Sequence, residues 1–277
     1  MTNVARTAGI SAEYISPPAL PPLSRKVRCS NARSPSAIMH AFANPARFLR
    51  IARPLTPVLL LSGLAITAAA LVYGLFYAPA ERLQGETVRI LFIHVPTAWL
   101  GMAGWSAIAV ASLVELVWRH PLAALAARGS ALPGAVFAAL CLASGSLWGR
   151  PAWGTYWVWD GRLTSMLVLL FLYLGYIALA NAVQREGGSS RIPAIFGLVG
   201  AVNIPIIHYS VIWWNSLHQP PSLGWGTSHM AGPFLWGLLA ATLGFTLIFA
   251  GVVLARMRAL LAQIQAEARL RRKALEA

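Results

Sequence analysis

Six long runs of apolar residues constrain this chain more than any other feature of its sequence. They lie at about residues 54–77, 93–117, 131–149, 165–183, 192–212 and 233–255. Each run is about long enough to cross the hydrocarbon core of a bilayer, which takes roughly 20 residues of α-helix. The mean hydropathy of +0.63 and the 57% hydrophobic content agree with this interpretation. The sequence therefore predicts an all-α integral membrane protein, built as a bundle of six transmembrane helices.

Two polar segments flank these runs. Residues 1–45 contain stretches rich in Pro and Ser, "SPPALPPLS" and "SNARSPSA", which predict a poorly ordered extension, and Met39 is a candidate alternative start. Residues 256–277 continue the last run as a basic helix, which we expect to be solvated and attracted to acidic lipid headgroups. The predicted membrane domain is therefore residues 46–255.

The basic residues predict the orientation of the bundle. The net charge of +14 does not indicate a nucleic-acid partner, because the basic residues are spread between apolar runs. If the N-terminus is cytoplasmic, all but four of the 22 basic residues fall on the cytoplasmic side. The exceptions are Arg82, Arg89, Arg150 and Arg162. Since cytoplasmic loops carry an excess of Lys and Arg, both termini are predicted to be cytoplasmic.

Several common kinds of site are not indicated. The two cysteines, Cys29 and Cys141, are far apart, and the chain has no CxxC or CxxCH sequence. A disulfide framework, a structural zinc site and a covalent c-type haem are therefore not expected. The chain also has no Walker motif that would supply energy from ATP.

Most of the 11 tryptophans fall in two segments on the predicted outer side. They are Trp148, Trp153, Trp157 and Trp159 in the first segment and Trp213, Trp214 and Trp225 in the second. One interpretation is an interfacial aromatic belt, but a belt is spread over both faces of a membrane. The other interpretation, which we favour, is a platform for a flat apolar ligand that stacks on indole rings.

Two histidines are predicted at similar depth on the same outer side. His94 begins the second span, and His208 lies near the outer end of the fifth. A lone histidine near a helix end usually only forms interfacial hydrogen bonds, but two opposed neutral imidazoles suit the axial positions of haem iron. The four outer arginines could bind the haem propionates. Asp160 would repel them, so we expect it to orient Arg162 or a ring N–H.

These segments resemble a known family. The stretch "WGTYWVWDGRLTS", residues 153–165, resembles the WWD signature of the haem-handling proteins of cytochrome c maturation. "HVPTAW" and "IIHYSVIWWNSLHQP" resemble the histidine-bearing segments that flank this signature in the smallest, six-span branch, the CcmC family. The resemblance covers about residues 45–255, with the WWD loop at about 148–165. Tyr156 stands where some members carry tryptophan.

The resemblance implies a function and a set of partners. Members hold haem b transiently at the periplasmic surface of the bacterial inner membrane, with two histidines as axial ligands, and deliver it to the haem chaperone CcmE. They work beside CcmD and the transporter subunits CcmA and CcmB, and they are not enzymes. Carried over, the ligands are His94 and His208, and the platform includes Trp153, Trp157, Trp159 and Asp160. His218, ten residues past His208 on the predicted outer loop, is the most plausible substitute ligand.

Two other functions remain open from the sequence. A membrane b-type cytochrome that exchanges electrons with quinone is one, although no histidine falls at mid-membrane by the span limits above. A transporter that moves haem across the membrane is the other, although only Glu115 and scattered Ser, Thr and Asn residues offer a polar route through the bundle.

Overall fold

The computed structural model describes residues 44–276, except 215, 219–222, 225–226 and 229. The predicted N-terminal extension and the candidate start at Met39 lie outside the described residues, apart from the last two residues of the extension.

The described chain is almost entirely helical. Its elements are α2 (Pro45–Val72), a π-helical turn η1 (Tyr73–Tyr77), a 3-10 helix η2 (Glu86–Ile90), α3 (Leu91–Trp118), α4 (Pro121–Trp153), α5 (Gly161–Arg185), α6 (Arg191–Gly200), α7 (Asn203–Trp213), a hairpin of β1 (Leu223–Gly224) and β2 (Thr227–Ser228), and α8 (Gly232–Glu276). Six helical segments in the described chain are long and apolar enough to cross a membrane. The predicted fold class of six membrane helices is therefore confirmed.

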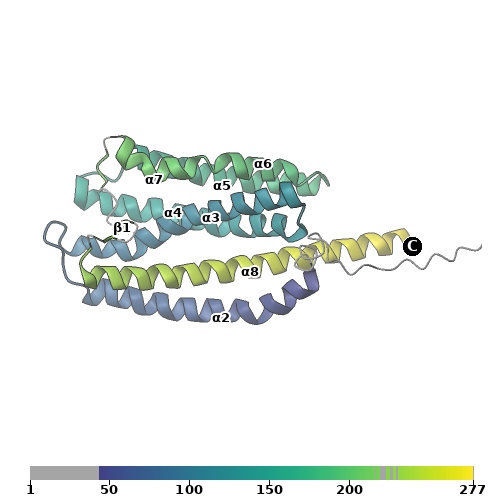
Figure 1. Cartoon of the computed structure of the whole chain (residues 1–277), viewed down its shortest axis with the longest axis horizontal. Helices are drawn as coiled ribbons and strands as arrows, with labels where there is room; N and C mark the ends of the chain where they lie inside the picture. Colours follow the sequence, from purple (N-terminus) through teal and green to yellow (C-terminus); the bar gives the residue numbers. More distant parts are fainter. Residues whose placement is uncertain (1–43, 215, 219–222, 225–226, 229, 277) are drawn as a thin grey trace, which may run out of the picture.

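The helices pack as three neighbouring groups in Figure 1. α2 lies beside α8 at one edge, α3 and α4 occupy the middle, and α5 lies with α6 and α7 at the opposite edge. α2, α4 and α7 end at one end of the bundle, where α3, α5 and α8 begin, and we call it the loop end. At the other end, the terminal end, α2 begins and α8 projects.

The fifth span differs from the single helix that its hydropathy predicts. It is divided into α6 and α7, and the backbone between them makes short i→i+3 hydrogen bonds at Ala201, Val202 and Ile204. Pro205 explains the division, because its nitrogen carries no hydrogen to donate to the carbonyl of Ala201. Membrane helices tolerate such breaks where neighbouring elements satisfy the freed groups.

The core is built from large aromatic rings packed against glycines. Trp105 is fully buried, lies edge-on to Tyr173 at 5.0 Å, and donates a hydrogen bond from its indole nitrogen to the carbonyl of Gly197. The hydroxyl of Tyr173 donates to the carbonyl of Gly101 at 2.7 Å. A Cβ at Gly134 would overlap this tyrosine ring. Small residues thus let the helices approach closely, as expected where lipid removes the hydrophobic driving force.

The α2–α8 pair uses the same device. A Cβ at Gly63 of α2 would lie 2.9 Å from the Gly244 carbonyl of α8, and one at Gly251 would lie 2.8 Å from the side chain of Leu60. A Cβ at Gly244 would overlap the hydroxyl of Thr67 and lie 2.7 Å from its backbone nitrogen. The two helices are therefore in backbone contact over several turns.

We predict that Gly244→Ala destabilises the protein, because backbone atoms of α2 have to move to make room for one methyl group. Overpacking of this kind costs about 1–3 kcal/mol. Thermal unfolding of the purified protein in detergent measures the loss. Gly232→Ala is the matched control, since a Cβ at that position meets nothing within 4 Å. Equal unfolding midpoints for the two variants would contradict the close contact.

Candidate functional site

The WWD segment is a short, sharply bounded turn between α4 and α5. α4 ends after Trp153, where Gly154 takes the left-handed conformation (φ 79°) and donates its N–H to the carbonyl of Arg150. α5 begins after Asp160, whose side chain accepts a hydrogen bond from the N–H of Leu163 at 2.8 Å. Only residues 154–160 of the predicted loop at about 148–165 are therefore non-helical.

The Asp160 carboxylate joins this turn to the segment that follows α7. One oxygen, Oδ1, caps α5, and the other, Oδ2, accepts from the hydroxyl of Ser216 at 2.7 Å and contacts Nδ1 of His218 at 2.8 Å. The Asp160 side chain is 8% exposed. Burial by itself raises its pKa, but the hydrogen bonds from Leu163, Ser216 and His218 outweigh burial, so the pKa of Asp160 is lowered. Asp160 is therefore an anion.

His218 is held against the same turn. Its side chain is 16% exposed, and its ring lies 4.7 Å from the ring of Trp153, centroid to centroid. Burial lowers the pKa of His218, and although Asp160 opposes this shift, the pKa remains below its ordinary value. His218 is therefore a neutral imidazole at neutral pH. Because Asp160 can only accept, Nδ1 carries the proton and Nε2 keeps its lone pair.

His94 is held by α4. Its Nδ1 lies 3.1 Å from the hydroxyl of Ser144, and that hydroxyl donates to the Leu140 carbonyl at 2.7 Å. Ser144 therefore accepts from Nδ1, which leaves the lone pair of His94 on Nε2. Gly145 makes room for the ring, because a Cβ there would lie 2.9 Å from its Cε1 atom. Trp148 packs edge-on to the ring at 5.6 Å.

Gln84 extends this arrangement to the segment between α2 and α3. Its side-chain oxygen accepts a 2.9 Å hydrogen bond from the indole nitrogen of Trp148, which packs on His94. The sequence analysis identified Trp148 but missed Gln84, Ser144 and Ser216. Ser144 could have been found, because it lies four residues before Trp148 and therefore on the same face of α4.

The described residues bring His94 and His218 within electrostatic range of each other. His208, the second histidine that the sequence analysis selected, lies elsewhere on α7. Its side chain is exposed and packs edge-on to Tyr209 at 4.8 Å, and its carbonyl accepts a 3.3 Å hydrogen bond from the guanidinium of Arg162. Arg162 interacts electrostatically with His94, His218 and Asp160.

The remaining aromatic side chains form two groups. Trp157 and Trp159 pack edge-on at 5.5 Å, and Trp159 is 77% exposed. Next to them, the Arg150 guanidinium lies 5.7 Å above the exposed ring of Tyr156 and donates to the Gly154 carbonyl.

The second group continues α7. Trp213 stacks on Tyr209 at 5.5 Å and meets Trp214 edge-on, and a Cβ at Gly161 would lie 3.0 Å from the Trp214 ring. Trp225 lies outside the described residues.

The described site offers two kinds of chemistry. Two neutral imidazoles present Nε2 lone pairs, and each is oriented by a partner at its Nδ1, which is the arrangement typical of metal-bound histidines. The turn that carries Asp160 also holds the indole pair of Trp157 and Trp159, of which Trp159 is exposed. Haem iron can take two axial nitrogens and its porphyrin suits an apolar surface, and the residues here have the chemistry for both.

Comparison with known proteins identifies relatives of this chain. The family model described as "Heme exporter protein C" (CcmC) matches residues 38–272. Heme exporter protein C of Bradyrhizobium diazoefficiens is 50% identical over 220 residues, which is 78% of this chain and 82% of that protein. The protein of the same name from Escherichia coli K12 is 42% identical over 225 residues, or 80% of this chain and 90% of that protein.

A further relative is the Heme exporter protein C of Haemophilus influenzae, which is 39% identical over 221 residues, or 79% of this chain and 90% of that protein. The family match covers most of the chain, including every span and the turn with Asp160. The chain therefore belongs to the CcmC family, the heme exporter C proteins.

Proposed function

We propose that this protein binds haem at the loop end of its bundle and delivers it to a partner for cytochrome c maturation. One observation carries the proposal: two buried or half-buried histidines, His94 and His218, both have Nδ1 engaged and Nε2 available. Iron bound to a porphyrin has two axial positions, so two such nitrogens complete its coordination. The role is that of a haem-handling transport component and not that of a catalyst.

The second axial ligand has two candidates. His208 was favoured by its depth in the sequence, but its ring is exposed on α7 beside Tyr209. His218 is supported by its carboxylate partner, Asp160, which fixes the tautomer and raises the basicity of the ring. We therefore prefer His94 and His218 as the pair that binds iron.

Further side chains suit the other parts of the haem. Trp157 has a buried indole nitrogen, and Arg162 a buried Nε, without a hydrogen-bond partner among the described residues. Donors of this kind suit the propionates, and the cation of Arg162 matches their charge. We assign the exposed face of Trp159, together with Trp153, to the porphyrin ring. Arg150, Tyr156, Trp213 and Trp214 form the border of this surface.

The six apolar spans and the bacterial relatives make the chain a multi-pass protein of the bacterial inner membrane. The excess of basic residues at the terminal end supports an orientation with both termini in the cytoplasm and the loop end in the periplasm. In this orientation haem b is bound transiently and passed to the chaperone CcmE. CcmD and the transporter subunits CcmA and CcmB are the further partners, and residues 256–277 form a cytoplasmic helix.

We predict that His94→Ala and His218→Ala each lower haem occupancy and change the Soret band of the purified protein, because each removes one axial nitrogen. His208→Ala should leave the spectrum unchanged. Added imidazole should partly restore the bands in the first two variants, since it supplies the missing nitrogen. The opposite result, with His208→Ala defective and His218→Ala normal, would restore the pair that the sequence favoured. Normal spectra in all three variants would remove the bis-histidine proposal.

We predict a different defect for the indole pair. Trp157→Ala or Trp159→Ala should weaken haem binding by roughly 1–3 kcal/mol per ring, by analogy with bases stacked on aromatic side chains. Imidazole cannot replace a stacking surface, so it should restore nothing. Haem titration followed by absorbance measures both effects. Trp118→Ala is the control, because Trp118 ends α3 at the terminal end of the bundle. A full response to imidazole would refute the stacking role.

The haem-free protein should show a depressed pKa at His218. NMR titration of the ring should give a midpoint below the ordinary histidine pKa of about 6.5, because burial disfavours the cation. Asp160→Asn should lower the midpoint further, since the carboxylate is what raises it. In the unsubstituted protein, the depressed pKa means that folded His218 binds fewer protons than unfolded His218 around pH 6. The free energy of unfolding should therefore fall as the pH drops below about 6.5. A higher midpoint in Asp160→Asn would contradict this environment.

A further inference from the structure

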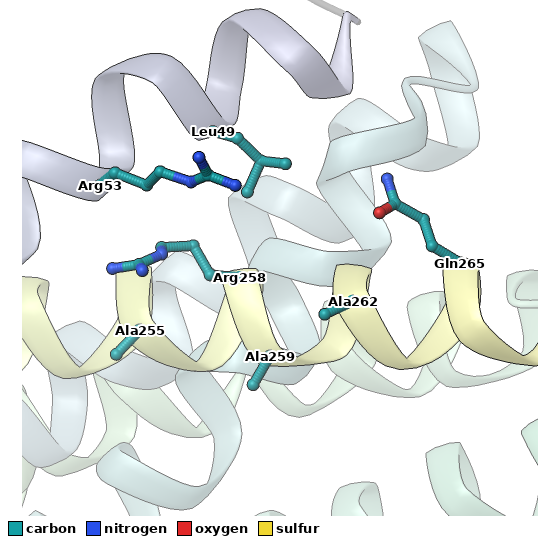
Figure 2. A pocket seen from close by; sticks show the side chains of 7 residues that line it. All are labelled: Leu49, Arg53, Ala255, Arg258, Ala259, Ala262 and Gln265. Carbon is teal, nitrogen blue, oxygen red and sulfur yellow. The ribbon is translucent and has the colours of Figure 1, made fainter.

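A groove lies between α2 and α8 at the terminal end of the bundle, far from the histidines. Figure 2 shows its two walls. Its lining residues are Leu49 and Arg53 of α2 and Ala255, Arg258, Ala259, Ala262 and Gln265 of α8. The cavity volume is about 430 Å³. The three alanines leave the α8 wall without bulk, which gives room for a ligand between the helices.

The groove carries two positive charges and no negative one among its lining residues. The guanidinium groups of Arg53 and Arg258 both lie in the space between the two helices, and the amide of Gln265 extends toward the same space (Figure 2). Two cations that share one groove repel each other. An anion between them removes this repulsion and can accept hydrogen bonds from both guanidinium groups.

The positions of Arg53 and Arg258 along the bundle axis can be compared by counting residues along the two helices from a common level near the loop end. There Tyr73, the first residue of η1 directly after α2, contacts α8, since a Cβ at Gly237 would lie 2.9 Å from its ring. Arg53 lies 20 positions before Tyr73, and Arg258 lies 21 positions after Gly237. Helices rise about 1.5 Å per residue, so both arginines lie roughly 30 Å from that level. The two arginines therefore lie at the same depth, and their distance from that level is about the thickness of the hydrocarbon core.

The surface next to the groove is apolar. Leu61 and Leu64, further along α2 toward the loop end, are 69% and 61% exposed. In a membrane such side chains face acyl chains. An anion in the groove can therefore belong to a molecule whose tails lie along α2, and a soluble anion has no use for this surface.

We propose that the groove binds the phosphate of an acidic membrane phospholipid, held between Arg53 and Arg258, with its acyl chains along α2. Basic pockets between membrane helices are a known way of binding such headgroups. The lipid would bridge α2 and α8 at the place where Ala255, Ala259 and Ala262 leave them apart. It would thereby stabilise the α2–α8 pair where α8 leaves the membrane.

The test uses the full chain, purified in detergent and stripped of lipid. Phosphatidylglycerol should bind, as counted by native mass spectrometry, and should raise the unfolding temperature more than phosphatidylcholine does. Arg53→Gln combined with Arg258→Gln should weaken phosphatidylglycerol binding by about tenfold, since each arginine near an acidic headgroup contributes to affinity. The matched control is Arg50→Gln combined with Arg269→Gln. It removes the same charge from the same two helices, at exposed positions that do not line the groove.

Retained binding in the control and its loss in the groove variant would establish the site. Equal losses in the two double variants would overturn it, because attraction would then depend only on overall charge. Inorganic phosphate at the same concentration tests the source of the anion, and an equal thermal shift with phosphate would overturn the assignment to lipid. Arg53→Lys combined with Arg258→Lys keeps the charge and should retain most of the binding. If this variant folds but binds no more lipid than the glutamine variant, the two positive charges do not account for lipid binding in the groove, and the proposal is overturned.

Discussion

The carboxylate of Asp160 is the interaction on which the loop end depends. With one oxygen it begins α5, and with the other it holds Ser216 and His218, which follow α7. A single buried charge thus joins the turn after α4 to a segment more than 50 residues later in the chain. Three hydrogen-bond donors contact the carboxylate. They allow it to remain ionised although the Asp160 side chain is only 8% exposed.

His94 and His218 are oriented by different devices. His94 depends on α4, where Ser144 supplies an acceptor and Gly145 supplies space. His218 depends on Asp160 and on the ring of Trp153. Both devices converge because α4 and α5 are joined by only seven residues, which begin with the left-handed Gly154. Helix packing therefore sets the distance between the histidines, and local hydrogen bonds set their tautomers.

The same glycine-based packing holds the rest of the bundle together. Tyr173 and Trp105 fill the centre against Gly101, Gly104 and Gly134, while Gly63 and Gly244 bring α2 against α8. At the terminal end, a groove with Arg53 and Arg258 opens between α2 and α8. The protein thus has a densely packed middle and two ends with different chemistry. The loop end carries aromatic rings and histidines, and the terminal end carries the two arginines of the groove.

The number of spans, the segment with the tryptophans and the importance of Asp160 could be predicted from the sequence, because hydropathy and motif spacing are local properties. Pro205 marks a place in the fifth span that invites a kink, but hydropathy averages over a break and predicts one continuous run there. The surroundings of His208 and His218 were decided only by the tertiary structure. Both lie near the outer end of the fifth span in sequence. The exposure of the His208 ring depends on how α7 is rotated against α5. The position of His218 depends on its contact with Asp160, which is distant in the sequence. Such rotations are set by side-chain packing between helices, which no single segment of sequence contains.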